Sequence, residues 1–250
     1  MLFDGVGTET LRTNKVQPIA FLPKVRLGND HCQRELPSSR HHCKCGLRPI
    51  DTFSVLMALF TYFICFFLLA FVWRSVVVYR RTGKNPVVLP AQDNAYGYVG
   101  RAFKIVIAAV AAVVTLNAAL PDASDWFGRL AFLEVQALHV AGWTLLIASL
   151  VWLLVAQAQM GDSWRVGIDS NNSTDLVSKG LFSVSRNPIF LSMRVNLLGL
   201  FFVLPSGATL TILVAGEILM QLQVRLEEAH LAALHGKPYA QYKAGVRRWL

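Results

Sequence analysis

The sequence has few charged side chains. Of its 250 residues only 16% are Asp, Glu, Lys or Arg, while 54% are hydrophobic, and the mean hydropathy is +0.44. A soluble domain usually carries about a quarter charged residues, so this composition excludes an ordinary soluble domain and predicts an integral membrane protein. Acidic residues are the scarcer kind, 15 against 24 basic ones. Because the basic residues gather at the ends of apolar segments, where they set topology and meet anionic lipid, the net charge of +9 predicts no nucleic-acid partner.

The sequence also lacks the motifs of several common enzyme classes. No glycine-rich stretch follows a strand pattern and opens a helix, which excludes a P-loop and a soluble dinucleotide-binding fold. No Gly-x-Ser-x-Gly stretch indicates a serine hydrolase.

Cysteine is scarce, with four residues that suggest no disulfide framework. Three of them lie in a polar N-terminal stretch with three histidines, and the fourth, Cys65, lies in the first apolar segment. The spacing of this N-terminal set matches no known zinc module, so we predict no metal site and leave metal binding by the stretch as an alternative to a flexible tail. The set consists of Cys32, Cys43, Cys45, His31, His41 and His42.

Long apolar runs dominate the rest of the chain, and a helix that crosses a bilayer needs about 20 such residues. Three runs cover 52–73, 102–120 and 130–156. A further run, 189–222, is too long for one helix and is interrupted by Pro205-Ser206-Gly207. This interruption predicts a tight helical hairpin with arms 189–204 and 208–224.

We therefore predict an all-α polytopic membrane bundle with about five transmembrane helices, of which the last two form the hairpin. Residues 1–50 are expected to be a polar, flexible extension, and residues 51–156 hold three transmembrane helices. Residues 157–250 hold the hairpin and a helical tail.

Basic residues predict the orientation in the membrane. The loop after the first span carries Arg80, Arg81 and Lys84, whereas the next loop has Asp122 and Asp125. Basic loops stay in the cytoplasm, so we expect the C-terminal tail to be cytoplasmic and the N-terminus to lie outside. A re-entrant segment near residues 85–100 would invert that end.

Two charged residues face each other across the predicted hairpin. Arg194 lies twelve residues before Ser206 and Glu217 lies eleven after it, so both sit roughly 17 Å from the turn. Ionisable groups inside a membrane are costly unless paired, and they are functional candidates by default. We predict an Arg194–Glu217 pair that is catalytic, with a purely structural ion pair as the alternative.

Polar residues continue from this pair to the predicted cytoplasmic mouth of the hairpin. Glu217, Gln221, Arg225 and Glu228 follow at steps of four, four and three, which places them on one helical face. Arg186 stands at the start of the other arm, just before Asn187 and a helix-opening proline, and shares a face with Phe190 and Arg194. The mouth is therefore expected to be a polar pocket with both signs of charge, although an ordinary solvated helix end would also explain any single one of these residues.

Three separated blocks resemble a known family. They are "MGDSWRVGID", "TDLVSKGLFSVSRNPIFL" and "RLEEAHLAALHGKPYAQYKAGVRRWL", and in this order they are similar to the C-terminal signature of the isoprenylcysteine carboxyl methyltransferase and phospholipid methyltransferase superfamily. The resemblance covers about residues 157–250 and implies an integral membrane enzyme of the bacterial type. It implies methyl transfer from S-adenosylmethionine, bound in a cytoplasm-facing pocket between the hairpin mouth and the tail, in what we expect to be a bacterial inner membrane.

The resemblance also implies roles for particular residues. Its first block contributes three consecutive residues, with Phe190 where the family often has tyrosine, and Asn187 replaces the histidine of the eukaryotic carboxyl methyltransferases. That replacement bears on the prenylcysteine substrate more than on the cofactor. The implied cofactor-binding residues are Arg186, Asn187, Pro188, Phe190, Arg225, Glu227, Glu228, Tyr239 and Tyr242, with Gly236 in the same tail. The predicted catalytic residues are Arg186, Arg194, Glu217 and Glu228.

The acceptor stays open between a carboxylate, a phospholipid amine and a thiol, in a lipid-like or small molecule. An anionic acceptor would need Arg186 or Arg194 to position it, whereas an amine would need a glutamate to take its proton. Two other functions also remain: a membrane sterol-type reductase that uses NADPH, and a non-catalytic transport or assembly protein.

Overall fold

The structure is a computed structural model that describes residues 49–87, 94–120, 122–165 and 176–250. All of these belong to one compact unit, Gly46–Leu250. The predicted extension 1–50, apart from its last two residues, lies outside the described residues, and so do the histidines and cysteines of its N-terminal set.

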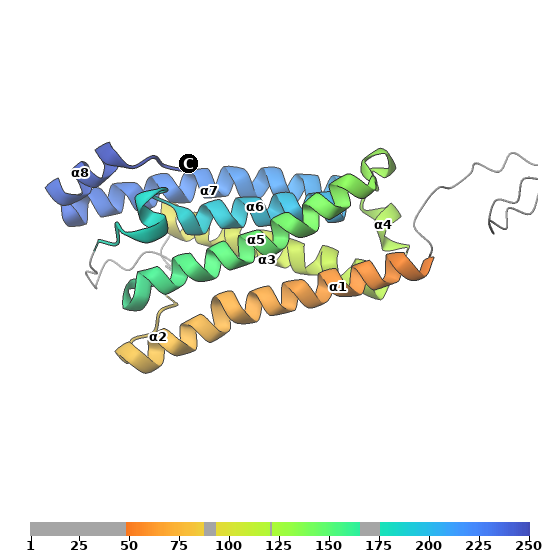
Figure 1. Cartoon of the computed structure of the whole chain (residues 1–250), viewed down its shortest axis with the longest axis horizontal. Coiled ribbons are helices and arrows are strands. Elements are labelled where there is room, and N and C mark those ends of the chain that lie inside the picture. Colours follow the sequence, from red (N-terminus) through yellow and green to blue (C-terminus); the bar gives the residue numbers. More distant parts are fainter. Residues whose placement is uncertain (1–48, 88–93, 121, 166–175) are drawn as a thin grey trace, which may run out of the picture. The chain divides into compact units, whose positions relative to one another are not determined.

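Helices make up nearly all of the described chain, and Figure 1 shows the long ones running alongside one another. This confirms the predicted all-α fold. The longer helices are α1 (Pro49–Phe67), α2 (Arg74–Thr82), α3 (Ala95–Ala119), α5 (Gln136–Met160), α6 (Pro188–Val203), α7 (Gly207–His235) and α8 (Lys237–Gly245). The shorter ones are α4 (Ala123–Trp126), a π-helical segment (Leu68–Trp73) and 3₁₀ turns at Ala131–Leu133, Gly161–Ser163 and Gly180–Ser183.

Four stretches of helix are long and apolar enough to cross a membrane. They are Phe53–Thr82, in which α1, the π-helical segment and α2 are continuous, and Ala95–Ala119, Gln136–Ser163 and Gly207–His235. The predicted fourth span, α6, is apolar but has only 16 residues. At 1.5 Å per residue it is about 24 Å long, less than the hydrocarbon thickness of about 30 Å.

Several helices begin or end at other residues than predicted, because the hydropathy of the sequence indicates only weakly where a helix ends. The first helix continues through a basic last turn to Thr82. It ends there because Gly83 follows with a φ of 68°, a conformation that favours glycine. The predicted span 130–156 begins later, at Gln136, after a 3₁₀ turn. The second arm of the hairpin runs on from 224 to His235, so Glu227 and Glu228 lie on α7 itself.

The hairpin turn between α6 and α7 is fixed by hydrogen bonds. The Ser206 hydroxyl caps α7 by accepting from the Thr209 backbone N–H, and the Thr209 hydroxyl in turn accepts from the Ser206 backbone N–H. Gly207 donates its N–H to the Gly128 carbonyl at 2.8 Å, which ties the turn to the segment after α4. We call this end of the bundle the turn end. In Figure 1, α2, α8 and the C-terminus lie at the opposite end, which we call the tail end.

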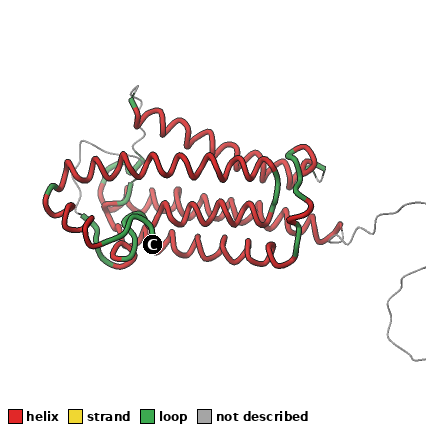
Figure 2. The backbone as a smooth tube through the Cα atoms, turned by 90° about the horizontal axis from the view of Figure 1, so that it is seen from above, coloured by secondary structure: helices red, strands yellow, loops and turns green. Residues whose placement is uncertain are grey.

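The closest packing between two helices is that of α5 against α6. Figure 2 shows the long helices side by side, with the loops gathered at the two ends. A buried apolar cluster of α1, α3, α5, α6 and α7 fills the space towards the turn end. Three helices are also joined by polar groups, because Asn196 donates to the hydroxyls of Tyr62 and Ser149. The core members are Leu56, Leu59, Val113, Val114, Leu146, Leu200, Val203, Leu204 and Ile212.

The contact of α5 with α6 requires glycine at position 142. A Cβ there would lie 2.8 Å from Val203 Cγ2 and 2.9 Å from the Val203 backbone nitrogen. We expect Gly142→Val to lower the free energy of unfolding by about 1–3 kcal/mol, because the two backbones must separate. The measurement is thermal unfolding in detergent. Gly100→Val is the matched control, since a Cβ at that helical position meets nothing within 4 Å; equal effects of the two changes would contradict the prediction.

Candidate functional site

The strongest cluster of charges lies at the tail end, around the carboxylate of Glu228. This side chain is only 6% exposed. Arg248 donates two bonds to it, Nε to Oε1 and Nη2 to Oε2, both at 2.9 Å. Arg186 Nη2 donates to Oε1 at 3.0 Å, and Lys243 Nζ lies 3.9 Å from Oε2. One buried carboxylate therefore holds three cations.

Arg186 reaches this cluster because of the turn that precedes α6. Gly180 opens the turn with a φ of 66°, a backbone conformation that favours glycine, and the end of the Gln159 side chain from α5 packs against it. Pro188 then starts α6 and is fully buried, with its carbonyl accepting a bond from Trp152 Nε1 at 3.1 Å. These contacts fix the backbone on both sides of Arg186.

The Arg186 side chain is 9% exposed and is held on two sides. Its Nη1 donates to the Lys243 carbonyl at 2.8 Å, and its backbone N–H donates to the Arg247 carbonyl at 2.9 Å. Its Nε is buried and has no hydrogen-bond partner within the described chain. A buried N–H without a partner is costly, so an acceptor group placed beside this atom would be stabilised by it.

Helix α8 places two tyrosines beside the cluster. Tyr239 is 1% exposed, and burial is the main cause that raises its pKa to about 12. Burial likewise raises the pKa of Tyr242 to about 12, and its hydroxyl donates to the Phe182 carbonyl at 2.6 Å. Both groups are therefore neutral hydroxyls at physiological pH, and Tyr242 ties α8 to the turn that precedes α6.

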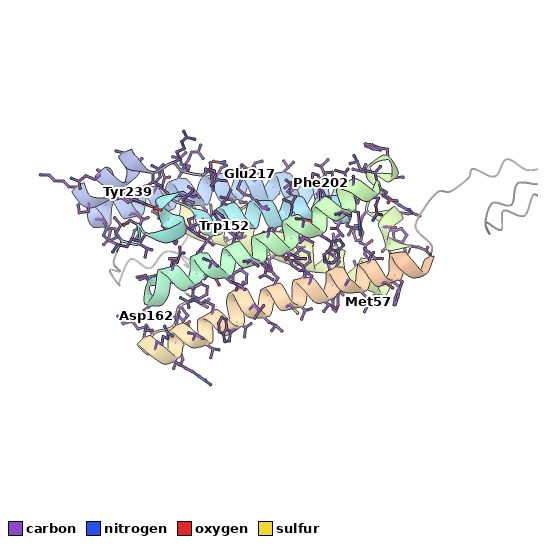
Figure 3. The ribbon with its side chains drawn as sticks, viewed as in Figure 1. Met57, Trp152, Asp162, Phe202, Glu217 and Tyr239 are labelled. Atoms are coloured by element: carbon purple, nitrogen blue, oxygen red, sulfur yellow. The ribbon has the colours of Figure 1, made fainter. Side chains whose placement is uncertain are left out.

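The predicted pair across the hairpin is present. Arg194 Nε donates to Glu217 Oε2 at 2.6 Å, and Gln221 Nε2 donates to the other carboxylate oxygen at 2.9 Å. Arg225 continues the row by donating to the side chain and carbonyl of Gln221. The contact of Arg194 with Glu217 is therefore present as predicted, and the row runs from Glu217 to Arg225, whereas the catalytic role of the pair stays a prediction. Figure 3 shows Glu217 between Tyr239 at the tail end and Phe202 towards the turn.

The guanidinium of Arg194 also lies over an aromatic ring from the end of the chain. Its Cζ is 4.3 Å from the ring centroid of Trp249, within the range of a cation–π contact. Arg194 is the seventh residue of α6, about 9 Å from the start of that helix. Because the tail contacts the start of α6 at Arg186, it can also reach Arg194.

The structure brings together only part of the predicted site. Arg186, Asn187 and Glu228 meet at the tail end, with Asn187 Nδ2 donating to the Arg248 carbonyl at 3.2 Å. Tyr239 and Tyr242 border this cluster, and Pro188 supports it from within α6. Phe190 and Glu227 are half-buried on their helices, and no ion pair within the described part of the chain involves Glu227.

Arg225 faces a different region, a pocket between the start of α3 and α7. The pocket has a volume of about 400 Å³ and is lined mainly by apolar groups. Tyr98 and Leu222, two of its lining residues, are 64% and 45% exposed, so the pocket lies at the outer surface of the bundle. Its lining consists of Asn94, Ala95, Tyr98, Val99, Leu222, Arg225 and Leu226.

Sequence reasoning missed three residues that the structure adds to the cluster. These residues are Arg248, Trp249 and Ser185, to which the sequence patterns assign no role. Ser185 is fully buried and its hydroxyl donates to the Arg248 carbonyl at 3.3 Å. The final "VRRWL" is the sequence signal for Arg248 and Trp249, because an arginine and a tryptophan there follow a polar helix.

The central elements of this site lie within a stretch that matches a protein family. The family model described as phospholipid methyltransferase matches residues 137–238, which run from α5 through α6 and α7 into the start of α8. Neither the curated proteins nor the solved structures contain a match. The match confirms the resemblance to membrane methyltransferases over these residues, and it includes Arg186, Arg194, Glu217 and Glu228.

Proposed function

We propose, on the match of residues 137–238 to the phospholipid methyltransferase family model, that this integral membrane protein transfers a methyl group from S-adenosylmethionine to a lipid-like acceptor. The observation that carries the proposal is the Arg186–Glu228 cluster at the mouth of the hairpin. It combines a buried carboxylate, a surplus of cations and an arginine N–H without a partner in one place.

The residues of this cluster fit the methyl donor. S-adenosylmethionine carries an amino acid end with an ammonium and a carboxylate group. Arg186 and Glu228 offer one charge for each of these groups, and the unpartnered Nε of Arg186 is a free donor for a carboxylate. Asn187, Tyr239 and Tyr242 surround the cluster and are the further residues that would hold the donor there.

The donor supplies an activated methyl group on a positively charged sulfur. When bound, it would give this methyl group to the acceptor's lone pair, with the neutral thioether as the leaving group. The chain's task in such an in-line displacement is to orient the two molecules and exclude water. The buried Glu228 and Arg186 suit this task because they are fixed by several contacts before a substrate binds.

A lipid-like acceptor is supported by the pocket between α3 and α7. Its apolar walls suit a hydrocarbon chain, and Arg225 on the same pocket suits a polar or anionic head group. The pocket lies on the tail-end half of α7, on the helix that also carries Glu228. An amphiphile would reach this pocket from the bilayer rather than from water.

Basic residues at the tail end support a cytoplasmic active site. The last turn of α2 carries Arg80 and Arg81, and α8 ends on a turn with Lys243. These side chains belong on the cytoplasmic face of a membrane.

The direct test is calorimetric titration of the detergent-purified protein with S-adenosylhomocysteine, beside NADPH. We expect saturable binding of S-adenosylhomocysteine and none of NADPH. Binding of NADPH alone would favour the reductase, and binding of neither by a folded protein would favour a transport or assembly role.

The acceptor pocket is tested by filling it. We expect Leu222→Trp to lower the transfer of labelled methyl groups into lipid vesicles at least about tenfold, because the larger ring occupies the space that a hydrocarbon chain needs. Binding of S-adenosylhomocysteine should stay unchanged. The control is Leu210→Trp on the same helix, a residue that is 41% exposed and does not line the pocket. Equal activity of the two variants would count against an acceptor in this pocket.

A further inference from the structure

The last residues of the chain form polar contacts with the predicted site. Residues 247–249 form their hydrogen bonds, within the described part of the chain, with Ser185, Arg186, Asn187 and Glu228. The ring of Trp249 lies over Arg194. These contacts join the tail to members of both charged pairs, Arg186–Glu228 and Arg194–Glu217.

Arg248 holds Glu228 more firmly than the other two cations do. Its two parallel N–H bonds to both carboxylate oxygens fix the plane of the carboxylate, whereas Arg186 donates one bond and Lys243 lies at 3.9 Å. Such a fork is the geometry by which arginine orients a carboxylate. The pairing also raises the pKa of Arg248 above its usual range through its hydrogen bonds to Glu228.

The carbonyl of Arg248 orients the opposite side of the same site. It accepts bonds from the Ser185 hydroxyl at 3.3 Å and from Asn187 Nδ2 at 3.2 Å. Arg248 therefore contacts both the segment before α6, at Ser185 and Asn187, and α7, at Glu228. These two parts of the site are far apart in the sequence.

Trp249 acts on the second charged pair in the same way. Arg194 is bonded to Glu217 through its Nε, and its guanidinium lies against the Trp249 ring at 4.3 Å. The flat ring restricts the rotation of the guanidinium about its long side chain. The two neighbouring residues of the tail thus reach the two charged pairs, one at the mouth and one deeper in the hairpin.

We propose that Arg248 and Trp249 are positioning residues of the methyl-transfer site: Arg248 fixes the carboxylate of Glu228 and Trp249 fixes the guanidinium of Arg194. The end of the chain is then a wall of the site that is in place before the donor binds. This inference rests on the proposed function. It predicts that the tail helps the site to bind the methyl donor and does not block the donor from entering.

The test compares the affinity for S-adenosylhomocysteine of the full-length wild type and of matched variants, by calorimetry in detergent, with the melting temperature of each. Arg248→Met is expected to bind at least about tenfold more weakly, because Glu228 loses its fixed orientation. Arg248→Lys keeps the charge without the fork and should bind with intermediate affinity and a melting temperature near that of the wild type. The control is Lys237→Met, which removes the same charge at an exposed position of α8 and should leave the affinity unchanged.

Trp249 is tested by the same assay together with methyl transfer to lipid vesicles. Trp249→Phe keeps a ring and should retain most of the transfer, whereas Trp249→Leu should lose at least about tenfold. Because Arg194 lies away from Glu228, we expect Trp249→Leu to change transfer more than donor affinity.

The outcomes separate this inference from the proposed function. Failure of the wild type to bind S-adenosylhomocysteine overturns both. Binding by the wild type and equal or tighter binding by Arg248→Met overturns this inference alone, since tighter binding would mean that the tail blocks the site. If Arg248→Met does not fold, Arg248→Lys decides the question: wild-type affinity of that variant overturns the assignment of Arg248.

Discussion

Replacing Glu228 by glutamine is expected to weaken the binding of S-adenosylhomocysteine by about 10- to 100-fold. The change keeps the shape of the side chain and removes the charge that would pair with the donor's ammonium group. A hydrogen bond to a charged group contributes about 1.5–3 kcal/mol, which corresponds to that range of affinity. Calorimetric titration in detergent measures it.

The same change is expected to lower thermal stability. Glu228 is buried and balances Arg186 and Arg248, so its neutralisation leaves two cations close together with no anion between them. Breaking a buried pair in this way costs about 3–5 kcal/mol. The control is Glu134→Gln, because Glu134 pairs with Arg129 in an exposed ion pair towards the turn end, where such pairs contribute up to about 1 kcal/mol. Wild-type donor affinity in a folded Glu228→Gln variant would exclude Glu228 from the donor site.

The second large effect concerns the pair inside the hairpin. Glu217→Leu is expected to lower the free energy of unfolding by about 2 kcal/mol, because the guanidinium of Arg194 keeps only Trp249 and loses its carboxylate. The two side chains are 28% and 37% exposed, which keeps the cost below that of a fully buried pair. Thermal unfolding in detergent or in lipid nanodiscs measures this change.

The double variant Arg194→Met with Glu217→Leu separates a structural from a catalytic role. Replacing both members of an ion pair by apolar residues is often neutral or stabilising, so we expect stability to return. Methyl transfer to lipid vesicles should nevertheless fall at least about tenfold if Arg194 orients the acceptor. A double variant that is stable and fully active would show that the pair only holds the hairpin together.

The fold and part of the site were predictable because they depend on short-range regularities. Residues that lie twelve before and eleven after a turn must stand opposite each other in an antiparallel hairpin, which is why the Arg194–Glu217 pair could be predicted. Steps of three and four along α7 likewise predicted the row from Glu217 to Arg225. The bounds of α6 (Pro188–Val203) lie within one residue of the predicted arm 189–204, because the interruption at Pro205-Ser206-Gly207 shows where the helix must end.

Arg225 illustrates the limit of a face drawn on a single helix. It shares a face with Glu217 and Gln221, and the structure shows the expected contacts. Nevertheless α3 packs beside it and turns its surroundings into a separate pocket. Periodicity gives the direction of a side chain on its own helix, whereas the identity of the neighbouring helix depends on the packing of the whole bundle.

Local apolarity, helical spacing and contiguous motifs were enough to predict the membrane-embedded all-α class, the hairpin, the charged pair within it and the resemblance to membrane methyltransferases. The three-dimensional arrangement was needed to find that Arg248, 20 residues beyond Glu228, is its two-bond partner, and that the Trp249 ring lies over Arg194. Such contacts depend on where the chain turns back towards α6 after α8, and many packing contacts together set that path, whereas no pattern along the chain shows it.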